Sequence, residues 1–312
     1  MSSKPLVPTV APGPELGSAR WSYDEAFSRH RGLFSPQDQE RLRNSRVAVA
    51  GLGGVGGVHL VTLSRLGIGS FHIADPDHFD LANFNRQYGA NTRNLGRGKA
   101  EVMAEEARAI NPDVRLRVFA GGVTPANLAE FLDGVDVLID GIDFFALDTR
   151  RLLFREARRR GIWGVTAGPL GFSTAWLVFS PTGMPFDDYF DLSDSMDRLD
   201  QVVAFLVGLA PRATHRDYVD LSQLNLQTRR GPSAGLACQL CSGVAAAETL
   251  KILLGRQPVR PAPWYFQFDA YQQRLVKGRL WWGNRHPLQR LKRWGLRKFL
   301  VRLGFQPTAA SS

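Results

Sequence analysis

A glycine-rich turn that follows directly on a short valine-rich run constrains the fold of this chain more than any other feature. The run is "RVAVA" (46–50), and the turn that follows contains Gly51, Gly53, Gly54 and Gly56. A short apolar run rich in valine is typical of a buried parallel strand. Glycines let the backbone turn tightly and approach phosphates, and the N-terminus of a following helix offers free N–H groups. The pattern predicts a strand–turn–helix unit that binds a phosphate, and a turn without a ligand is the alternative.

Strand-like and helix-like segments alternate over residues 45–167. Further short strands are predicted by "SFHIAD", "VRLRVF", "DVLID" and "IWGVTA", at 70–75, 114–119, 136–140 and 162–167. A short helix is predicted to open at Ser35-Pro36-Gln37-Asp38, with Ser35 as its cap. Further helices are predicted from the turn to about 66, at 99–110, after the Thr124-Pro125 cap and at 145–160. This alternation predicts an α/β fold with a Rossmann-like, doubly wound and mainly parallel sheet.

The alternation ends after "FSTAWLVFS" (172–180). Residues 181–235 are predicted to be rich in loops, with one helix near 199–209. A helix at about 240–254 follows, and 263–269 and 272–278 are predicted as late antiparallel strands. We therefore expect an arm at 1–20, a nucleotide domain at 21–180, a substrate or dimer region at 181–279 that completes the same domain, and a tail at 280–312.

Composition limits the class of protein. Of the 312 residues, 44% are hydrophobic, which is enough for a full core. The longest apolar run, Val202–Ala210, is shorter than the roughly 20 residues that span a bilayer. The N-terminal arm is rich in proline, lacks the apolar core of a signal peptide and is predicted to be disordered. Two cysteines, Cys238 and Cys241, do not make a disulfide framework, so a cytoplasmic location is expected.

Positive charge is concentrated at one end of the sequence. The chain has 39 Lys and Arg against 29 Asp and Glu, and the residues from 271 onward hold ten of these bases and no acid. The remainder is neutral, which argues against a nucleic-acid-binding body. The tail is either a partly packed helix that Gly295 interrupts, or a surface for an acidic partner, an anionic membrane or RNA.

An acidic residue ends the second predicted strand. Asp75 follows Gly51 by 24 residues, at the position that accepts hydrogen bonds from ribose hydroxyls in this fold. Asp77 is a second candidate for the nucleotide, or else a loop acid or helix cap. At this point the ligand could equally be NAD, FAD or ATP.

The stretch "NFNRQ" (83–87) favours a triphosphate. Transfer at an α-phosphate needs cations on the phosphoryl oxygens and the leaving pyrophosphate, and a carboxylate for Mg²⁺. Arg86 and Lys99 are the predicted cations and Asp143 is the predicted magnesium ligand, while Asn85 and Gln87 would hold the loop or bind phosphate oxygens. Each residue taken alone has an ordinary surface role, and the combination carries the prediction.

The order of these motifs resembles the ThiF/MoeB/HesA family of adenylating enzymes, which are related to ubiquitin-activating proteins. The stretches are "GLGGVGG", "IADPDHFDLANFNRQ", "GRGKAEV" and "VLIDGID", and "SGVAAAETLKILLG" (242–255) is similar to a late helix of the family. The resemblance implies a domain that binds ATP and Mg²⁺ and adenylates a carboxylate. In this family the carboxylate is usually the C-terminal glycine of a ubiquitin-like protein, and some members act on an acid carried by tRNA.

The resemblance also implies roles for individual residues. The four glycines would form the nucleotide loop and Asp75 would bind ribose. Asn85, Arg86 and Lys99 would bind phosphate, and Asp143 would bind magnesium. An arginine before the first strand reaches the ATP of the partner subunit in this family, and Arg29, or else Arg31, fits that place. A homodimer would follow.

The sequence departs from the family pattern in three respects. One Cys-x-x-Cys pair replaces the two that hold a structural zinc in many members, so we expect no such zinc. Residues 168–237 contain no cysteine, which excludes a thioester relay through that loop. Cys238 and Cys241 are substitute nucleophiles or, as we favour, inert core thiols. Phe144 stands where the family often has a polar residue.

Two other functions fit part of the sequence. A nicotinamide-dependent oxidoreductase would use the glycine turn and Asp75 but leaves Arg86 and Lys99 without a role. A non-catalytic nucleotide-binding module could recruit a partner through the basic tail. The substrate, the final acyl acceptor and the role of the tail do not follow from the sequence.

Overall fold

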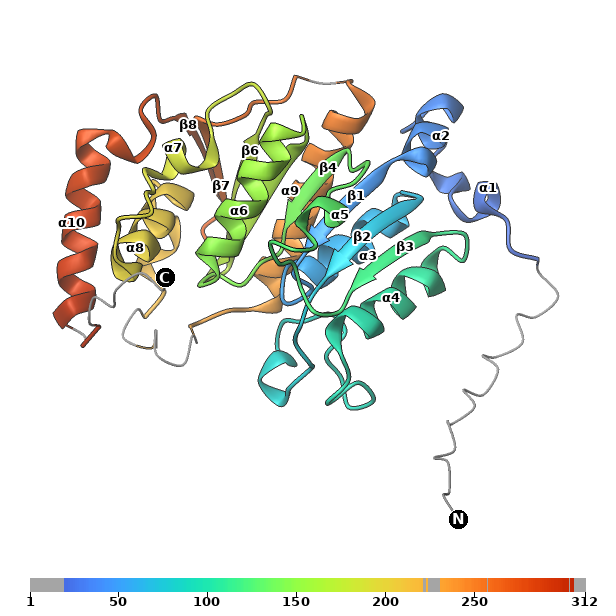
Figure 1. Cartoon of the computed structure of the whole chain (residues 1–312), viewed down its shortest axis with the longest axis horizontal. Coiled ribbons are helices and arrows are strands. Elements are labelled where there is room, and N and C mark those ends of the chain that lie inside the picture. Colours follow the sequence, from blue (N-terminus) through green and yellow to red (C-terminus); the bar gives the residue numbers. More distant parts are fainter. Residues whose placement is uncertain (1–19, 221–222, 224–230, 257, 303, 306–312) are drawn as a thin grey trace, which may run out of the picture.

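One eight-stranded sheet organises the computed structural model, which describes residues 20–220, 223, 231–256, 258–302 and 304–305 (Figure 1). The predicted arm, except for Arg20, lies outside the described residues. The strand order is β3-β2-β1-β4-β5-β6-β7-β8. The strands are β1 (Arg46–Ala50), β2 (Ser70–Ala74), β3 (Arg115–Phe119), β4 (Val137–Asp140), β5 (Trp163–Leu170), β6 (Ser173–Phe179), β7 (Trp264–Asp269) and β8 (Arg274–Arg279).

The first five strands are parallel and the last three are antiparallel. Val47 in β1 pairs with Phe71 in β2 and with Val137 in β4, so β1 is central to the parallel half. From β5 onward each strand runs against its neighbour, and Gly164 pairs with Phe179. The predicted α/β fold class is therefore confirmed, including the late antiparallel strands.

Helices cover both faces of the sheet. The α-helices are α1 (Tyr23–Ala26), α2 (Pro36–Asn44), α3 (Gly56–Arg65), α4 (Lys99–Ile110), α5 (Leu128–Phe131), α6 (Leu147–Arg159), α7 (Phe186–Phe190), α8 (Arg198–Leu209), α9 (Gly235–Leu254) and α10 (Pro287–Arg302). Short 3-10 turns are η1 (Ser28–His30), η2 (Leu81–Asn83), η3 (Thr214–Asp217) and η5 (Gly283–Arg285).

Alternate residues of the central strand belong to different cores. Val47 and Val49 pack with α3, α4 and α9 on one face, whereas Ala48 and Ala50 pack with α5 and α6 on the other. The two-residue repeat of a strand requires this division. Within the described residues, α9 alone is long and apolar enough to cross a membrane, and half of its apolar stretch is buried inside the protein.

The observed helix starts agree with one of the two predicted N-caps and disagree with the other. Ser35 caps α2 as predicted, and its side chain and that of Asp38 form a capping box. The predicted cap at Thr124 is wrong, because α5 begins later, after Asn127. The side chain of Asn127 instead accepts a hydrogen bond from the Thr124 N–H, at 2.8 Å.

Three predictions for the second half need correction. Helix α9 begins at Gly235 rather than near Leu240, and its N-cap residue Ala234 makes no side-chain capping bond that could announce the start. Gly295 does not interrupt α10, because Leu296 and Leu300 pack on α8 and hold the helix through it. The 181–235 segment contains α7 and η3 besides the predicted helix, which is α8.

Candidate active site

The glycine turn follows β1 and packs closely against the segment that follows β4. Gly51 has a φ of 84°, which favours glycine, and its N–H donates to the Ala74 carbonyl at 2.7 Å. A Cβ on Gly51 would lie 2.2 Å from the Gly141 carbonyl oxygen, and one on Gly56 would lie 1.8 Å from the Gly51 oxygen. Glycine is therefore required at both positions so that the turn can pass between β1 and the segment after β4.

Asp75 fastens this turn to the end of β2. Its Oδ2 accepts the N–H of Leu52 at 2.6 Å, and its Oδ1 accepts the N–H of Asp77 at 2.8 Å. The side chain is buried, and burial raises its pKa, while the bond from Leu52 and the charge of Lys99 lower it. The predicted ribose ligand thus also shapes the glycine turn.

Lys99 begins α4 and is almost fully buried, with 8% of its side chain exposed. Its Nζ lies 3.0 Å from Asp77 Oδ2, and its N–H donates to the Asp77 carbonyl at 2.9 Å. Asp77 is exposed, so the pair opens toward solvent at the end of β2. An ammonium whose one counter-ion is exposed can exchange that partner for an anionic ligand at low cost.

Arg86 lies against the glycine turn. A Cβ on Gly54 would lie 3.7 Å from Arg86 Cγ. The guanidinium of Arg86 donates from Nη1 to the Ala82 carbonyl at 2.8 Å and to Asn85 Oδ1 at 3.0 Å. Asn85 in turn donates from Nδ2 to the Ser233 carbonyl at 2.8 Å, which ties this loop to the segment before α9. These hydrogen bonds hold the loop from η2 through Gln87 in place beside the glycine turn.

Gln87 brings an unpartnered polar atom to the same place. Its Nε2 lies 3.6 Å from the position of a Cβ on Gly53. Its Oε1 is buried and has no hydrogen-bond partner among the described residues. A buried acceptor without a partner is costly unless a ligand or water supplies the donor. A ligand or an ordered water beside the glycine turn would supply the donor that this atom needs.

Asp143 follows β4 and is exposed. Its Oδ1 accepts the N–H of Phe145 at 2.9 Å, so the side chain also caps the turn before α6. Hydrogen bonds from Arg150, a residue not predicted from the sequence, stabilise this turn. The buried Arg150 guanidinium donates to Asp140 Oδ2 at 2.8 Å and to the Ile142 carbonyl at 2.6 Å. Its position in the buried stripe of α6, three residues after Leu147, is the signal that could have identified it.

The sheet topology brings most of the predicted residues to one edge. The glycine turn and Asp143 follow β1 and β4, Asp75 and Asp77 follow β2, and these strands are parallel neighbours. The loop that carries Arg86 and the start of α4 complete the group, and Figure 1 shows the loop between β2 and α4 below the sheet. Ligands of such sheets bind at this carboxyl edge, where the strand order reverses.

Arg29 is not brought to this edge within the chain. It is exposed in η1, and the segment around it is anchored by the bond from the Tyr23 hydroxyl to the Gly67 carbonyl, beyond the C-terminal end of α3. Helix α3 starts at the glycine turn and has ten residues, so roughly 15 Å of helix separates the two ends. Figure 1 shows α1 and α2 on the opposite side of the sheet from the Arg86 loop.

Both cysteines are buried near the turn. A Cβ on Gly54 would lie 3.1 Å from Cys238 Sγ, and Cys241 Sγ lies 3.1 Å from Thr174 Oγ1. Burial raises the pKa of the Cys238 thiol to about 11 and raises that of Cys241 as well. Such thiols are protonated and poorly nucleophilic at neutral pH. In the described part of the chain, no three His, Cys, Asp or Glu side chains group as metal ligands, and the absence of a structural zinc stays a prediction.

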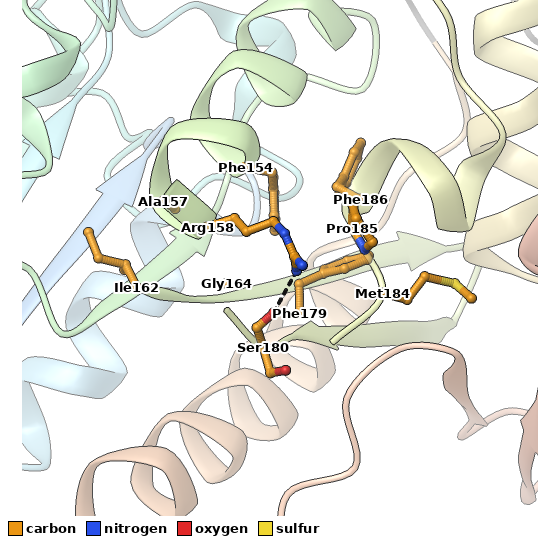
Figure 2. Close-up of a pocket in the computed structure, with 10 residues that line it drawn as sticks. All are labelled: Phe154, Ala157, Arg158, Ile162, Gly164, Phe179, Ser180, Met184, Pro185 and Phe186. Carbon is orange, nitrogen blue, oxygen red and sulfur yellow. Dashed lines mark hydrogen bonds between the residues drawn. The ribbon is translucent and has the colours of Figure 1, made fainter. Parts of the chain in front are cut away.

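A cavity lies at the opposite edge of the sheet (Figure 2). It is bounded by α6, the start of β5, the end of β6 and the segment before α7. Arg158 extends into it and donates to the carbonyls of Ser180 and Gly183, at 3.4 and 2.7 Å. Phe154 and Phe186 stack beside it with ring centroids 4.5 Å apart. Aromatic rings and an engaged guanidinium fill this space, so it does not compete with the carboxyl edge as the candidate site.

A model of the ThiF family matches residues 27–289, which is most of the chain. The chain belongs to the ThiF family. The matched region includes every predicted site residue and eight α-helices from α2 to α9. The resemblance that "GLGGVGG" and "NFNRQ" carried is therefore confirmed.

The relatives of this ThiF-family chain include two kinds of enzyme. The tRNA threonylcarbamoyladenosine dehydratase of Haemophilus influenzae is 33% identical over 154 residues, which are 49% of this chain and 58% of that protein. The probable adenylyltransferase/sulfurtransferase MoeZ of Mycobacterium tuberculosis is 34% identical over 189 residues, which are 58% of this chain and 46% of that protein. The alignment thus spans about half the length of these relatives.

Among solved structures, the crystal structure of PaaA in its selenomethionine form is similar in fold. Its TM-score is 0.62 at 19% identity, and the alignment covers 86% of this chain and 77% of PaaA. At this identity the likeness shows the shared fold only.

Proposed function

We propose that this chain is an adenylyltransferase that uses ATP and Mg²⁺ to adenylate a substrate carboxylate and releases pyrophosphate. The observation that carries the proposal is the gathering of Arg86, Lys99 and Asp143 around the glycine turn at one edge of the sheet. Membership of the ThiF family and the adenylyltransferase name of its relative MoeZ support it. Neither relative favours the nicotinamide-dependent oxidoreductase.

The residues fit a nucleotide with Mg²⁺. Space is open at Gly53, where a Cβ would meet nothing closer than Gln87 Nε2 at 3.6 Å, and Gln87 Oε1 lacks a donor within the described residues. Asp143 offers an exposed carboxylate, and protein-bound Mg²⁺ commonly takes one or two carboxylates with phosphate oxygens and waters. Mg²⁺ held there would neutralise charge on the phosphates.

In the proposed reaction a carboxylate oxygen of the substrate attacks the α-phosphorus of ATP. The bond between this phosphorus and the bridging oxygen breaks, and pyrophosphate leaves with that electron pair. Arg86 and Lys99 would exchange their present partners, the Ala82 carbonyl and Asp77, for phosphate oxygens on which charge develops. Asp75 would bind the ribose, with Asp77 beside it, and Asn85 would position Arg86.

The substrate class is a carboxylate, and its carrier is the finer part of the proposal. A peptide or ubiquitin-like C-terminus, a small acid and an acid borne by tRNA all qualify; one relative is named for a tRNA nucleoside. Rings of Phe172, Tyr218 and Tyr271 meet at the same edge, beyond β5 and β7, with centroids 5.2 to 5.6 Å apart. We propose that this aromatic cluster contacts the substrate. The acceptor of the acyl group would be a nucleophile other than Cys238 or Cys241.

Pyrophosphate exchange into ATP, screened over these carboxylates, tests the proposal. Exchange by the native chain that falls about 100-fold or more in Arg86→Ala is expected. The matched control is Arg93→Ala, because Arg93 is exposed in the same loop and has no ion pair in the described part of the chain. If ATP binds but no carboxylate supports exchange, the proposed activity is wrong.

We further propose a homodimer in which Arg29 completes the partner's site. Arg29→Ala and Arg86→Ala would then both be inactive alone. Mixing and re-equilibrating the two variants would restore about a quarter of native exchange, because half of the dimers become hybrids with one complete site each. A monomer in solution, or a mixture without recovery, would reject the dimer and leave the adenylation proposal standing.

A further inference from the structure

The basic residues of the C-terminal segment fall into two groups. Arg285, Arg293 and Arg297 pair with aspartates of the 188–200 region, between α7 and the start of α8. Apart from Lys292, whose Nζ donates to the Pro211 carbonyl at 2.6 Å, the others are exposed and make no ion pair with the described residues: Arg274, Lys277, Arg279, Arg290, Lys298 and Arg302. The paired group fastens α10 to the protein, so the second group provides an uncompensated positive charge on its outside.

Helix α10 also exposes apolar side chains. Its inner side carries Gln289, Leu296 and Leu300, which contact α8 or the residues around it. Its other sides expose Leu288, Leu291 and Trp294 by 61, 62 and 57%, and Phe299 by 40%. Helices of soluble proteins normally turn such residues toward the core. The helix is therefore fixed by one side and leaves a mixed apolar and basic surface uncovered.

Two tryptophans between β8 and α10 extend this surface. Trp281 and Trp282 are exposed by 60 and 63% and border a shallow groove beside Met184 and Pro185. Arg279 lies over the Trp281 ring, 3.4 Å from its centroid, and Lys298 Nζ lies 3.9 Å from the centroid of Trp294. Cations and indole rings alternate along this end of the protein, which Figure 1 shows in red, beside α8 and away from β3.

We propose that this C-terminal outer surface, formed by Trp281, Trp282 and the exposed side chains of α10, binds an anionic lipid bilayer. Anionic headgroups complement the unpaired bases. Indole rings favour the membrane–water interface, and leucine and phenylalanine side chains of an interfacial helix enter the acyl boundary. The helix lies along the bilayer in this arrangement and does not span it. The inference is independent of the proposed enzyme activity.

Other occupants fit less of this surface. A second copy of the same surface would bring unpaired bases against unpaired bases. RNA would satisfy the bases and could stack on the tryptophans, but it would leave Leu288 and Leu291 without an apolar partner. Of these three occupants, a lipid bilayer is the one that offers both anionic groups and an apolar layer.

Co-sedimentation of the full chain with vesicles tests the proposal. Binding is expected to vesicles of phosphatidylcholine with phosphatidylglycerol, to weaken with salt, and to be at least tenfold tighter than to phosphatidylcholine alone. The double variant Arg290→Gln/Lys298→Gln should bind about 25-fold more weakly, because each base near an anionic surface contributes about fivefold.

Two matched controls distinguish binding by this surface from the effects of net charge and of exposed apolar side chains in general. Arg65→Gln/Arg108→Gln removes the same charge from exposed positions on α3 and α4, and it should change binding by less than about twofold. Leu291→Ala should weaken binding several-fold, whereas Leu95→Ala, an exposed leucine of the Arg86 loop, should not. Unchanged thermal unfolding would show that each variant is folded.

Quenching of tryptophan fluorescence by brominated lipids reports insertion directly. Native protein on anionic vesicles should be quenched, and Trp281→Phe/Trp282→Phe/Trp294→Phe should lose most of the quenching. The proposal is overturned if the native chain does not bind anionic vesicles, or if the two charge variants bind equally well. A third outcome would also overturn it: the native chain self-associates or binds RNA but does not bind vesicles, and Arg290→Gln/Lys298→Gln abolishes that self-association or RNA binding.

Discussion

The carboxyl edge of the parallel strands and the outer side of α10 place their charged side chains differently. At the carboxyl edge of β3-β2-β1-β4, the charged side chains of Asp75, Lys99 and Arg150 are buried and hold loops. At the other end of the sheet, phenylalanines of α6, α7, α8 and β6 fill the core, and Arg290, Lys298 and Arg302 of α10 are exposed.

This difference distinguishes the candidate active site at the carboxyl edge from the exposed surface of α10. A buried charge is tolerated where it has a defined partner, and that partner holds it in one place where it can act on a ligand. The exposed bases Arg290, Lys298 and Arg302 of α10 have no such partners among the described residues. They contribute a positive electrostatic potential and an area that a partner can contact. The following predictions test the contrast, from the largest expected effect on stability to the smallest.

The largest effect is expected at the glycine turn. Gly56→Ala should destabilise the protein by more than about 4 kcal/mol or prevent folding, because the Cβ would overlap the Gly51 carbonyl oxygen. Gly53→Ala should cost less than about 1 kcal/mol, since nothing lies closer than 3.6 Å to its Cβ. It should still weaken ATP binding, because its Cβ partly fills the open space at this position. Thermal unfolding and ATP titration measure the two properties; equal stability losses would contradict the geometry.

The two kinds of ion pair should differ next. Arg150→Met leaves the buried Asp140 uncompensated and should cost about 3 to 5 kcal/mol. Arg285→Met removes an exposed pair of the antiparallel half and should cost less than about 1 kcal/mol. Urea unfolding of both variants is the measurement. A small loss at Arg150 would mean that the turn carrying Asp143 is held by other contacts.

The smallest effect concerns pH. His59 in α3 is fully buried, and this burial lowers its pKa to about 3 from an ordinary value of 6.5. The unfolded chain therefore takes up a proton below pH 6.5 that the folded chain does not, so stability falls as the pH decreases. The contribution reaches about 1.4 kcal/mol per pH unit. His59→Leu should flatten the slope of unfolding free energy between pH 6 and 5 by that amount. An unchanged slope would mean that His59 is protonated in the folded protein.

The sequence predicted the parallel half well because its signals are local. Valine runs, the glycine turn and a helix that begins at Lys99 each follow from short-range sterics and periodicity, and the structure reproduces them within a few residues. The start of α9 and the continuity of α10 through Gly295 depend on packing against distant segments. No pattern within the helix itself could give them.

The candidate site was predicted as a set of residues but not as a set of contacts. The topology brings Arg86, Lys99 and Asp143 to one edge, as parallel strands require. The bonds from Asp75 to the glycine turn, the pairing of Lys99 with Asp77 and the support by Arg150 depend on side-chain distances that no spacing rule encodes. The tail illustrates the same limit, since composition gave its charge but not the division between paired and unpaired bases.

The most direct test of the central claim is the affinity of the native chain, Arg86→Ala and Arg93→Ala for ATP with Mg²⁺, AMP and NAD, measured by calorimetry. The native chain should prefer ATP over NAD, and Arg86→Ala should lose about 10- to 100-fold in ATP affinity, the value of a charge-assisted hydrogen bond. The loss should be smaller for AMP, which lacks two of the phosphates, and Arg93→Ala should bind like the native chain. Tighter binding of NAD, or an ATP affinity that Arg86→Ala leaves unchanged, would contradict a triphosphate site at this edge of the sheet.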